Sequence, residues 1–416
     1  MILPKYSLGI GDRFAHEGRA QLAAFVRARE AGVEVAPVWN KSKREHLIVH
    51  SEPASVRVEA DAAVKSLGWD APYFVDADHI GLATVDRFIG PSDFFTLDVA
   101  DFIGKPADEG DIREFVTAQE KYAGTLAVPD IGASLDVSRD RIETIARKYL
   151  FAAREAGRIY RHIAAAKGPG TFITEVSMDE TDQPQTPIEL LFILAALASE
   201  RIPVQTIAPK FTGRFNKGVD YVGDVARFER EFSDDLAVIA FAIREFGLPA
   251  DLKLSVHSGS DKFSIYGPIR RAIRRTGAGL HVKTAGTTWL EELIGLAAAD
   301  GDGLEVAKDV YRAAAGRFDE LCGPYSAVID IDRARLPSPD EVDRWSSGEF
   351  VAALRHDPRC RQYNPSVRQL LHVGYKVAAQ LGSRFTGALE KHSAIISENV
   401  TANIFDRHLR PIFIDD

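Results

Sequence analysis

The chain has 416 residues and 45% hydrophobic content, which is enough for one large domain with additions or for two domains. Its net charge of −9 argues against a nucleic-acid binder, which usually presents a basic face. No run approaches the ~18 apolar residues of a membrane span, the N-terminus has no apolar signal core, and the two cysteines fit no metal or disulfide pattern. We therefore expect an intracellular protein in the reducing cytoplasm.

Short apolar segments alternate along the chain with longer helical patterns, which is typical of repeated βα units. Two Thr-x-x-Glu patterns, Thr186 with Glu189 and Thr288 with Glu291, predict capping boxes at helix starts. The predicted strands are Tyr6 to Gly11, Val35 to Asn40, Phe74 to Ala77, Phe94 to Val99, Phe172 to Val176, Pro203 to Ala208, Leu252 to Val256 and Gly279 to Val282.

The number and order of these strands predict a (β/α)8 TIM-like barrel, an α/β fold in which function lies at the C-terminal ends of the strands. Residues 1–300 are expected to form this catalytic barrel domain, with a mainly helical insertion at about residues 104–170 whose last helix lies near Ser138 to Ala166. Residues 301–416 are expected to form a helical C-terminal extension packed on the barrel. A doubly wound sheet is disfavoured because no Gly-x-Gly-x-x-Gly follows the first strand.

Polar side chains follow several of the predicted strands, so a barrel would bring them to one rim. They are Asp78, His79, Glu175, Gln205, Lys210, His257, His281 and Lys283. Three of the chain's 11 histidines are in this set, and together with a carboxylate they favour a divalent metal site. Imidazole and carboxylate ligands without thiolate suit zinc, manganese, cobalt or nickel.

Each of these residues also has a purely structural interpretation. Asp78 could cap a loop, or it could be a base beside the metal. Glu175 could pair with an inward-facing Lys or Arg, or it could take part in acid–base chemistry at a partly dry rim. The Ser-Gly-Ser after His257 could be an ordinary turn, or its backbone amides could approach an anion. The remaining cations are surface charges or clamps for a substrate carboxylate, and these are Lys210, Lys283 and Arg214.

The C-terminal helices leave one further question about the rim. His372 lies in a helical pattern, and a core or surface role is its simplest interpretation. Whether the helices around His372, Tyr375 and Lys376 close over the rim stays open.

Five longer motifs then carry a resemblance to a known family. They are DADHIG, ITEVSMDET, TIAPKFTGRFNKGVDY, LSVHSGSDKFSIYGPI and GLHVKTAGTTWLEE. Together, from about Gly9 to Glu292, they resemble the tagaturonate epimerase family, whose members interconvert D-tagaturonate and D-fructuronate and use a divalent metal. More remotely, the pattern is similar to class II fructose-bisphosphate aldolases, which are metal-dependent (β/α)8 barrels.

The aldolase similarity implies roles for particular residues. Asp78-His79 matches an Asp-His pair, and His257-Ser-Gly-Ser matches a His-Gly-Gly-Ser metal motif with one glycine replaced. Where the aldolases have a further metal histidine, this chain has Gln205, so His281 or Glu175 could serve instead. The resemblance thus implies Asp78 as base with Glu175 as partner acid, and metal ligands His79, Gln205 and His257. It implies a substrate-binding set of Lys210, Ser258, His281 and Lys283.

The family's reaction explains why the aldolase similarity matters. Tagaturonate and fructuronate differ at the carbon β to the ketone, where the carbonyl does not acidify the C–H bond. A retro-aldol route can invert that carbon: the base takes the hydroxyl proton, the adjacent C–C bond breaks, and the metal stabilises the enediolate as a Lewis acid. The bond then re-forms on the other face of the aldehyde. The resemblance therefore implies a metal-dependent epimerase of hexuronate catabolism.

Three alternatives remain at this point. The chain could be a metal-dependent aldolase of sugar acids, or a non-catalytic sugar-acid binding protein. Epimerisation by transient oxidation would need a nicotinamide site, for which we find no pattern. The expected partner is a small-molecule sugar acid, with no nucleic acid and no membrane, and a homo-oligomer is left open.

Overall fold

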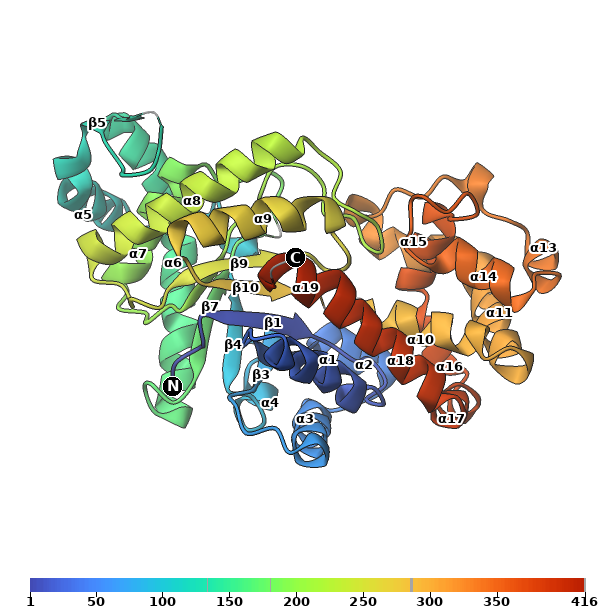
Figure 1. Ribbon diagram of the computed structural model, residues 1–416. Helices are drawn as coiled ribbons and strands as arrows, with labels where there is room; N and C mark the ends of the chain where they lie inside the picture. The colour runs from blue at the N-terminus through green and yellow to red at the C-terminus, as the bar shows by residue number, and fades with distance from the viewer. Residues whose placement is uncertain (133, 180, 285–286, 415–416) are drawn as a thin grey trace.

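A closed barrel of parallel strands forms the centre of the computed structural model, which describes residues 1–132, 134–179, 181–284 and 287–414 (Figure 1). Around the barrel the strands follow one another in the order β1-β10-β9-β8-β7-β4-β3-β2. Their bounds are β1 Tyr6–Ile10, β2 Ala36–Ser42, β3 Phe74–Ile80, β4 Phe94–Asp98, β7 Ile173–Ser177, β8 Thr206–Ala208, β9 Lys253–His257 and β10 Leu280–Lys283. The predicted (β/α)8 architecture and each of its strands are confirmed.

Helices surround the barrel and continue beyond it. Those up to β10 are α1 Gly18–Glu30, α2 Lys43–Val49, α3 Ala54–Leu67, α4 Asp86–Ile89, α5 Glu109–Gln119, α6 Arg139–Lys167, α7 Pro187–Ser199, α8 Val225–Phe246 and α9 Phe263–Thr276. After β10 come α10 Thr287–Ala298, α11 Gly301–Gly316, α12 Phe318–Cys322, α13 Pro339–Asp343, α14 Ser347–Leu354, α15 Pro365–Val373, α16 Tyr375–Gln380, α17 Ser383–Lys391, α18 Ser393–Ile404 and α19 Arg410–Phe413. No described helix is long and apolar enough to cross a membrane.

One of the two predicted capping boxes forms. Thr186 accepts from the backbone of Glu189, and the Glu189 side chain accepts from the backbone of Thr186, which starts α7. The prediction for Thr288 is wrong, because Thr288 is the second residue of α10 and its hydroxyl accepts from Gln21. Glu291 instead accepts from Asn403. Thr288 and Glu291 therefore bond to residues distant in sequence and not to each other.

The segment between β4 and β7 holds more than helices. α5 is followed by a small antiparallel sheet of β5 Gly124–Leu126 and β6 Leu135–Val137, and then by α6. The Ser138 side chain caps α6, and the helix packs against α7 and β4. α6 is thus the barrel helix at this position, and the added material lies before it.

The C-terminal residues form two parts with different positions. Helices α11–α17 make a lobe beside the barrel, on the side toward which the arrow of β1 points (Figure 1). The chain then returns, since α18 packs against α1 and α10, and α19 packs against α9 (Figure 1). The last helices therefore close the ring around the barrel. The proposed division at residue 300 stays a prediction.

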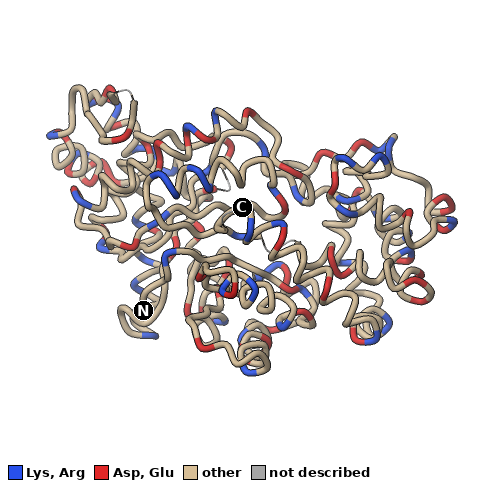
Figure 2. Tube along the Cα trace, in the orientation of Figure 1, with Lys and Arg blue, Asp and Glu red and all other residues tan. Residues whose placement is uncertain are grey.

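Charged residues are spread along the chain (Figure 2), whereas one end of the barrel interior is apolar. Acidic and basic residues are interspersed along the described chain (Figure 2). At one end of the barrel the interior is apolar and includes Val38, Phe74, Phe94 and Ile173. Toward the C-terminal ends of the strands the barrel interior holds the buried polar side chains of Asp76, Glu175 and Lys283, and this is the end at which barrel enzymes carry their function.

Candidate active site

A bulge at the end of β3 presents two functional side chains in succession. The register between β3 and β4 shifts between Ala77 and Ile80, and His79 has a φ of 51°. A bulge breaks the in–out alternation of a strand and re-aims its side chains. Asp78 and His79 therefore both turn toward the barrel mouth, where His79 Nε2 lies 3.7 Å from Asp78 Oδ1. A positive φ strains the backbone of a non-glycine residue, so the surrounding structure must stabilise this conformation of His79.

Lys283 occupies the barrel interior below this pair. Its Nζ lies 2.7 Å from Asp76 Oδ2, 3.0 Å from Asp78 Oδ1 and 2.9 Å from Glu175 Oε1, and it also donates to Thr96. A Cβ on its strand neighbour Gly9 would lie 2.9 Å from Lys283 Cγ, so only glycine leaves room for the lysine side chain. Lys283 is thus the buried counter-ion of three carboxylates.

His257 links Glu175 to a second carboxylate in the loop after β7. Its Nε2 lies 2.9 Å from Glu175 Oε1, while its Nδ1 lies 3.2 Å from Asp179 Oδ2 without hydrogen-bond geometry. Glu175 is fully buried and also accepts from Thr206. The Glu175 contact fixes the ring orientation of His257 and leaves the other nitrogen facing Asp179.

His79, Asp179 and His257 form a possible metal site. One ligand atom from each lies within 4.8 Å of the others, and they are the single such group among the described residues. The Nδ1 atoms of both histidines are buried and make no hydrogen bond. Two imidazoles and one carboxylate are a donor set that suits a divalent first-row metal, with a fourth position left for a substrate. The residues present therefore fit the cation that the sequence predicts.

The electrostatics of the cluster are strongly coupled. Burial lowers the pKa of His257, but Asp179 and Glu175 outweigh it and raise the pKa to about 9. For His79, burial is likewise outweighed by Asp78 and Asp98, so its pKa lies well above the ordinary value. Lys283 holds the pKa of Asp78 below its usual range despite burial. The carboxylates here thus stabilise bound positive charge, which a proton or a metal ion can supply.

Two predicted site residues, Gln205 and His281, lie away from the triad of His79, Asp179 and His257. Gln205 was expected at the rim, and this is wrong: its side chain accepts from Leu3 N at 2.8 Å and donates to Met1 O at 3.1 Å, at the N-terminal end of β8. His281 lies two residues before Lys283, deep in the barrel, with Nδ1 2.8 Å from Ser7 Oγ. Burial lowers its pKa to about 3, so it is neutral.

Ser258 and Lys210 have positions that fit supporting roles. The Ser258 hydroxyl is buried and donates to the backbone oxygen of Lys283 at 2.6 Å, so it fixes the loop after His257. Lys210 Nζ lies 3.4 Å from the backbone oxygen of Asp179, close to the triad. Arg214 instead extends to the C-terminal lobe, with Nη1 3.5 Å from Asp330 Oδ2.

Asp179, Asp76 and Asp98 were not among the predicted site residues. Asp179 lies two residues beyond the end of β7, in a stretch that is visibly acidic in the sequence. Asp98 ends β4 and its Oδ2 lies 3.4 Å from His79 Nδ1, so His79 has a carboxylate near each ring nitrogen. All three are acidic residues within a barrel strand or just after one, and this pattern could have identified them from the sequence.

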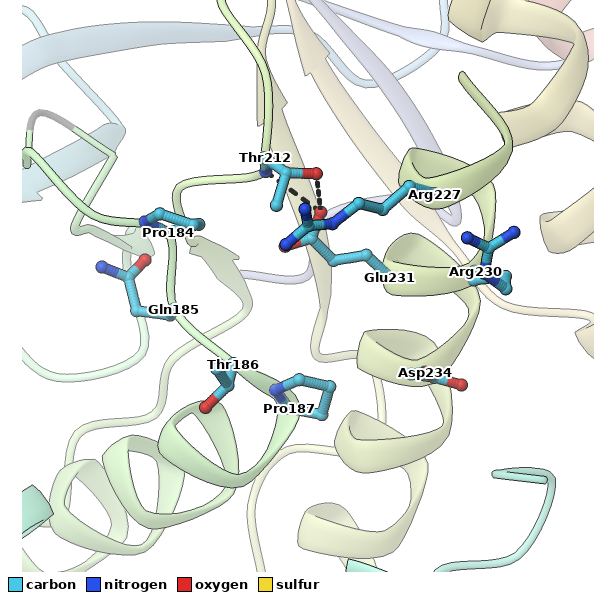
Figure 3. A pocket seen from close by; sticks show the side chains of 9 residues that line it. All are labelled: Pro184, Gln185, Thr186, Pro187, Thr212, Arg227, Arg230, Glu231 and Asp234. Carbon is cyan, nitrogen blue, oxygen red and sulfur yellow. Dashed lines mark hydrogen bonds between the residues drawn. The ribbon is translucent and has the colours of Figure 1, made fainter. Parts of the chain in front are cut away.

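A surface hollow of about 350 Å³ lies elsewhere, between the start of α7 and α8 (Figure 3). Within it, Glu231 accepts from the backbone and hydroxyl of Thr212 (Figure 3). Its lining includes none of the triad residues. One lining residue, Gln185, accepts a hydrogen bond from the backbone N–H of Lys210 at 2.6 Å. This bond fixes the loop that carries Lys210.

Known proteins are similar to this chain in sequence and in fold. The profile of a family described as tagaturonate epimerase (UxaE) matches residues 2–408. A Thermotoga maritima protein named tagaturonate/fructuronate epimerase is 28% identical over 420 residues, covering 97% of this chain and 80% of its own length. The native crystal structure of fructuronate-tagaturonate epimerase UxaE from Cohnella laeviribosi has a TM-score of 0.79 and 24% identity, covering 99% of this chain and 82% of that one. A glycerol complex of the same enzyme has a TM-score of 0.79 and 24% identity, covering 98% and 81%.

Proposed function

This chain belongs to the tagaturonate epimerase family and is an epimerase, and we propose that it interconverts D-tagaturonate and D-fructuronate by metal-dependent retro-aldol chemistry. The observation that carries the proposal is the triad of His79, Asp179 and His257 with Asp78 directly beside it. We place the enzyme in the cytoplasm, in keeping with its two unpaired cysteines, Cys322 and Cys360.

We assign the metal to His79, Asp179 and His257, in place of the predicted set with Gln205. A divalent ion bound there would act as a Lewis acid toward negative charge on the ketone oxygen of the substrate. Glu175 positions His257 from behind, as carboxylates commonly do for metal-binding histidines. Zinc, manganese, cobalt and nickel all suit this donor set.

Asp78 is proposed as the base. Its carboxylate is held ionised by Lys283, and it lies at the open end of the barrel next to His79. It takes the proton from the hydroxyl on the carbon to be inverted; that C–O becomes an aldehyde, and the bond to the α carbon breaks. The electron pair of the broken bond moves into the ketone and gives an enediolate, so no oxidant or reductant is needed.

Inversion then requires the aldehyde to turn before the bond re-forms, and its oxygen must regain a proton. The proton held by Asp78 has to return to this oxygen, and we propose that Asp98 passes it on, because Asp98 lies near the opposite ring nitrogen of His79 from Asp78. Glu175 was predicted for this role, but its surroundings disfavour it. It is fully buried, and Lys283 and His257 hold its pKa well below the ordinary value against the effect of burial.

The reaction is tested by proton NMR in D2O with tagaturonate, with and without added metal. Retro-aldol inversion retains the original hydrogen on the inverted carbon, so fructuronate should form without deuterium there. Deuterium at that carbon would overturn the retro-aldol route. Net release of a three-carbon aldehyde acid, without fructuronate, would favour the aldolase alternative. A purely binding protein is set aside because the family is one of epimerases.

A further inference from the structure

Positive and aromatic side chains gather where the C-terminal lobe meets the loops at the mouth of the barrel. Arg13 comes from the loop after β1, and Lys217 comes from the loop after β8. Tyr325 and Tyr375 come from the lobe, with their hydroxyl groups 3.5 Å apart. We call these four residues the mouth cluster.

Arg13 is buried without the hydrogen bonds that a guanidinium requires. Its side chain is 8% exposed, and Nε and Nη1 donate no hydrogen bond within the described part of the chain. It lies over the Tyr375 ring at 4.5 Å, and Nε lies 3.2 Å from Glu45 Oε1. Buried donors without acceptors are costly, so a planar anion that accepts from them would be favoured.

Lys217 adds a second positive charge beside the other tyrosine, Tyr325. Its Nζ lies 5.3 Å from the centre of the Tyr325 ring, and it has no carboxylate partner among the described residues. Its backbone N–H donates to Val328 O at 2.8 Å, which fixes the loop against the lobe. Arg13 pairs with the carboxylate of Glu45, whereas Lys217 has no carboxylate partner in the described part of the chain.

His372 lies beside the mouth cluster. It is 2% exposed, it lies next to Gly218, and its Nε2 has no hydrogen-bond partner in the described structure. Its pKa lies well below the ordinary value, first because of burial and then because Arg13 and Lys217 disfavour a further positive charge. The buried Arg13 donors without acceptors and the charge of Lys217 favour an anion at this position.

The mouth cluster lies at the same end of the barrel as the triad. Gly9 pairs with Lys283 in the β1–β10 register, and Arg13 follows four residues later, within about 15 Å of chain. The Lys217 loop packs on the loop after His257, because Gly218 N donates to Ser260 Oγ at 2.9 Å. Both cations thus stand on loops that also border the reacting end of the site.

We infer that Arg13 and Lys217 bind the carboxylate of the sugar acid and that Tyr325 and Tyr375 from the C-terminal lobe hold these cations in place. This inference rests on the proposed function and names how its substrate class is recognised. A planar guanidinium matches a carboxylate in two-point geometry, and Lys217 adds a point charge. The enzyme accordingly selects hexuronates over uncharged ketoses of the same configuration.

The test compares tagaturonate with tagatose, its uncharged counterpart, by calorimetric binding and by turnover. Arg13→Ala should raise KM for tagaturonate by about 10- to 100-fold, the range expected for one charge-assisted contact. Lys217→Ala should raise KM about tenfold, while kcat changes less than KM in both variants. Arg13→Lys should restore part of the loss. Tagatose binding should not change.

Lys376→Ala is the matched control, since Lys376 is the neighbour of Tyr375 but pairs outward with Glu320. It should leave KM unchanged. Metal binding, titrated with cobalt and followed by absorbance, should be equal in all variants. If the wild type turns tagaturonate over and Arg13→Ala and Lys217→Ala keep KM within twofold, the inference is overturned. If the wild type shows no turnover yet binds tagaturonate through Arg13, the proposed function fails and this inference stands.

Discussion

The imidazole rings of His79 and His257 meet edge to face across the barrel mouth, with centroids 5.2 Å apart and planes at 78°. Each ring has carboxylates beside its nitrogens, Asp78 and Asp98 for His79, and Glu175 and Asp179 for His257. Two strands from opposite sides of the barrel supply the histidines. This arrangement concentrates groups that could hold a metal ion at the C-terminal mouth of the barrel.

Removing a proposed metal ligand should weaken metal binding more than removing the carboxylate that orients that ligand. We expect His257→Ala to lower metal affinity by more than about 100-fold, and Glu175→Gln to lower it by about 10- to 100-fold, because outer partners orient the ligand. Metal content and chelator sensitivity of the purified variants provide the measurement. His162→Ala, on a surface pair with Asp86, is the control. Full metal content in His257→Ala would refute the assignment.

The base assignment makes a separate prediction for turnover. Asp78→Asn keeps the shape of the side chain but cannot accept the hydroxyl proton, so kcat should fall by about 100- to 10,000-fold. Metal affinity should stay within a few-fold of the wild type, which separates this variant from the ligand variants. Asp86→Asn, at an exposed position, serves as control. Near-full activity of Asp78→Asn with metal bound would eliminate Asp78 as base.

The sequence predicted the barrel because its strands are short apolar runs with consistent spacing, and each of them forms. It also predicted the end of β3, because apolar residues there give way abruptly to Asp78-His79. Gln205 was misplaced because β8 begins only at Thr206, so Gln205 precedes the strand and lies at its opposite end. A strand of three residues gives too little alternation to fix which end or face a side chain occupies.

Other parts of the site depended on geometry that local pattern does not encode. Lys283 was expected to clamp substrate, but its burial among three carboxylates follows from how far it lies inside the barrel. Asp179 lies in the loop after β7, and the path of a loop cannot be predicted from hydrophobic periodicity. That α18 and α19 close the helical ring could not be inferred either, because helical periodicity does not specify a packing partner.

Lys283 should be essential for stability. Lys283→Met would leave Asp76, Asp78 and Glu175 buried without a counter-ion, and breaking a buried ion pair in this way costs about 3–5 kcal/mol. Urea denaturation followed by tryptophan fluorescence measures the change. Lys148→Met, which breaks the half-exposed pair with Glu189, should cost no more than about 1 kcal/mol. Equal losses of stability in the two variants would contradict the interpretation that Lys283 neutralises the three buried carboxylates.

Glu17 should make stability depend on pH. Burial, and then the charge of Asp12, raise its pKa from 4.5 to about 8, so the folded protein holds a proton that the unfolded chain releases above about pH 4.5. Its contribution is complete below pH 4.5 and is lost as the pH rises toward 8, at up to about 1.4 kcal/mol per pH unit. Glu17→Gln keeps the group neutral and able to bond Ser397. Unfolding of this variant should therefore depend less on pH between 4.5 and 8. Identical pH profiles would exclude Glu17 as the titrating group.

Asp261 joins the loop after His257 to the C-terminal lobe and to the last helices. Its carboxylate is fully buried, and it lies 2.8 Å from Arg368 Nη2, 3.0 Å from His356 Nδ1 and 3.3 Å from His408 Nε2. Arg368→Met removes the permanent positive charge from this network, so we expect a loss of about 3–5 kcal/mol. Adding Asp261→Asn removes the stranded charge as well. The double variant should therefore be more stable than the two single losses added together, by about 0.5–3 kcal/mol.

Arg312, an exposed arginine of the same lobe, serves as the comparison. Arg312→Met, which breaks the surface pairs with Asp309 and Asp343, should change the free energy of unfolding by no more than about 1 kcal/mol. Urea denaturation of all four variants completes the cycle. Strict additivity of Arg368→Met and Asp261→Asn would mean that the two residues do not stabilise each other. In that case the Asp261–Arg368 pair would not be what holds the lobe to the loop after His257.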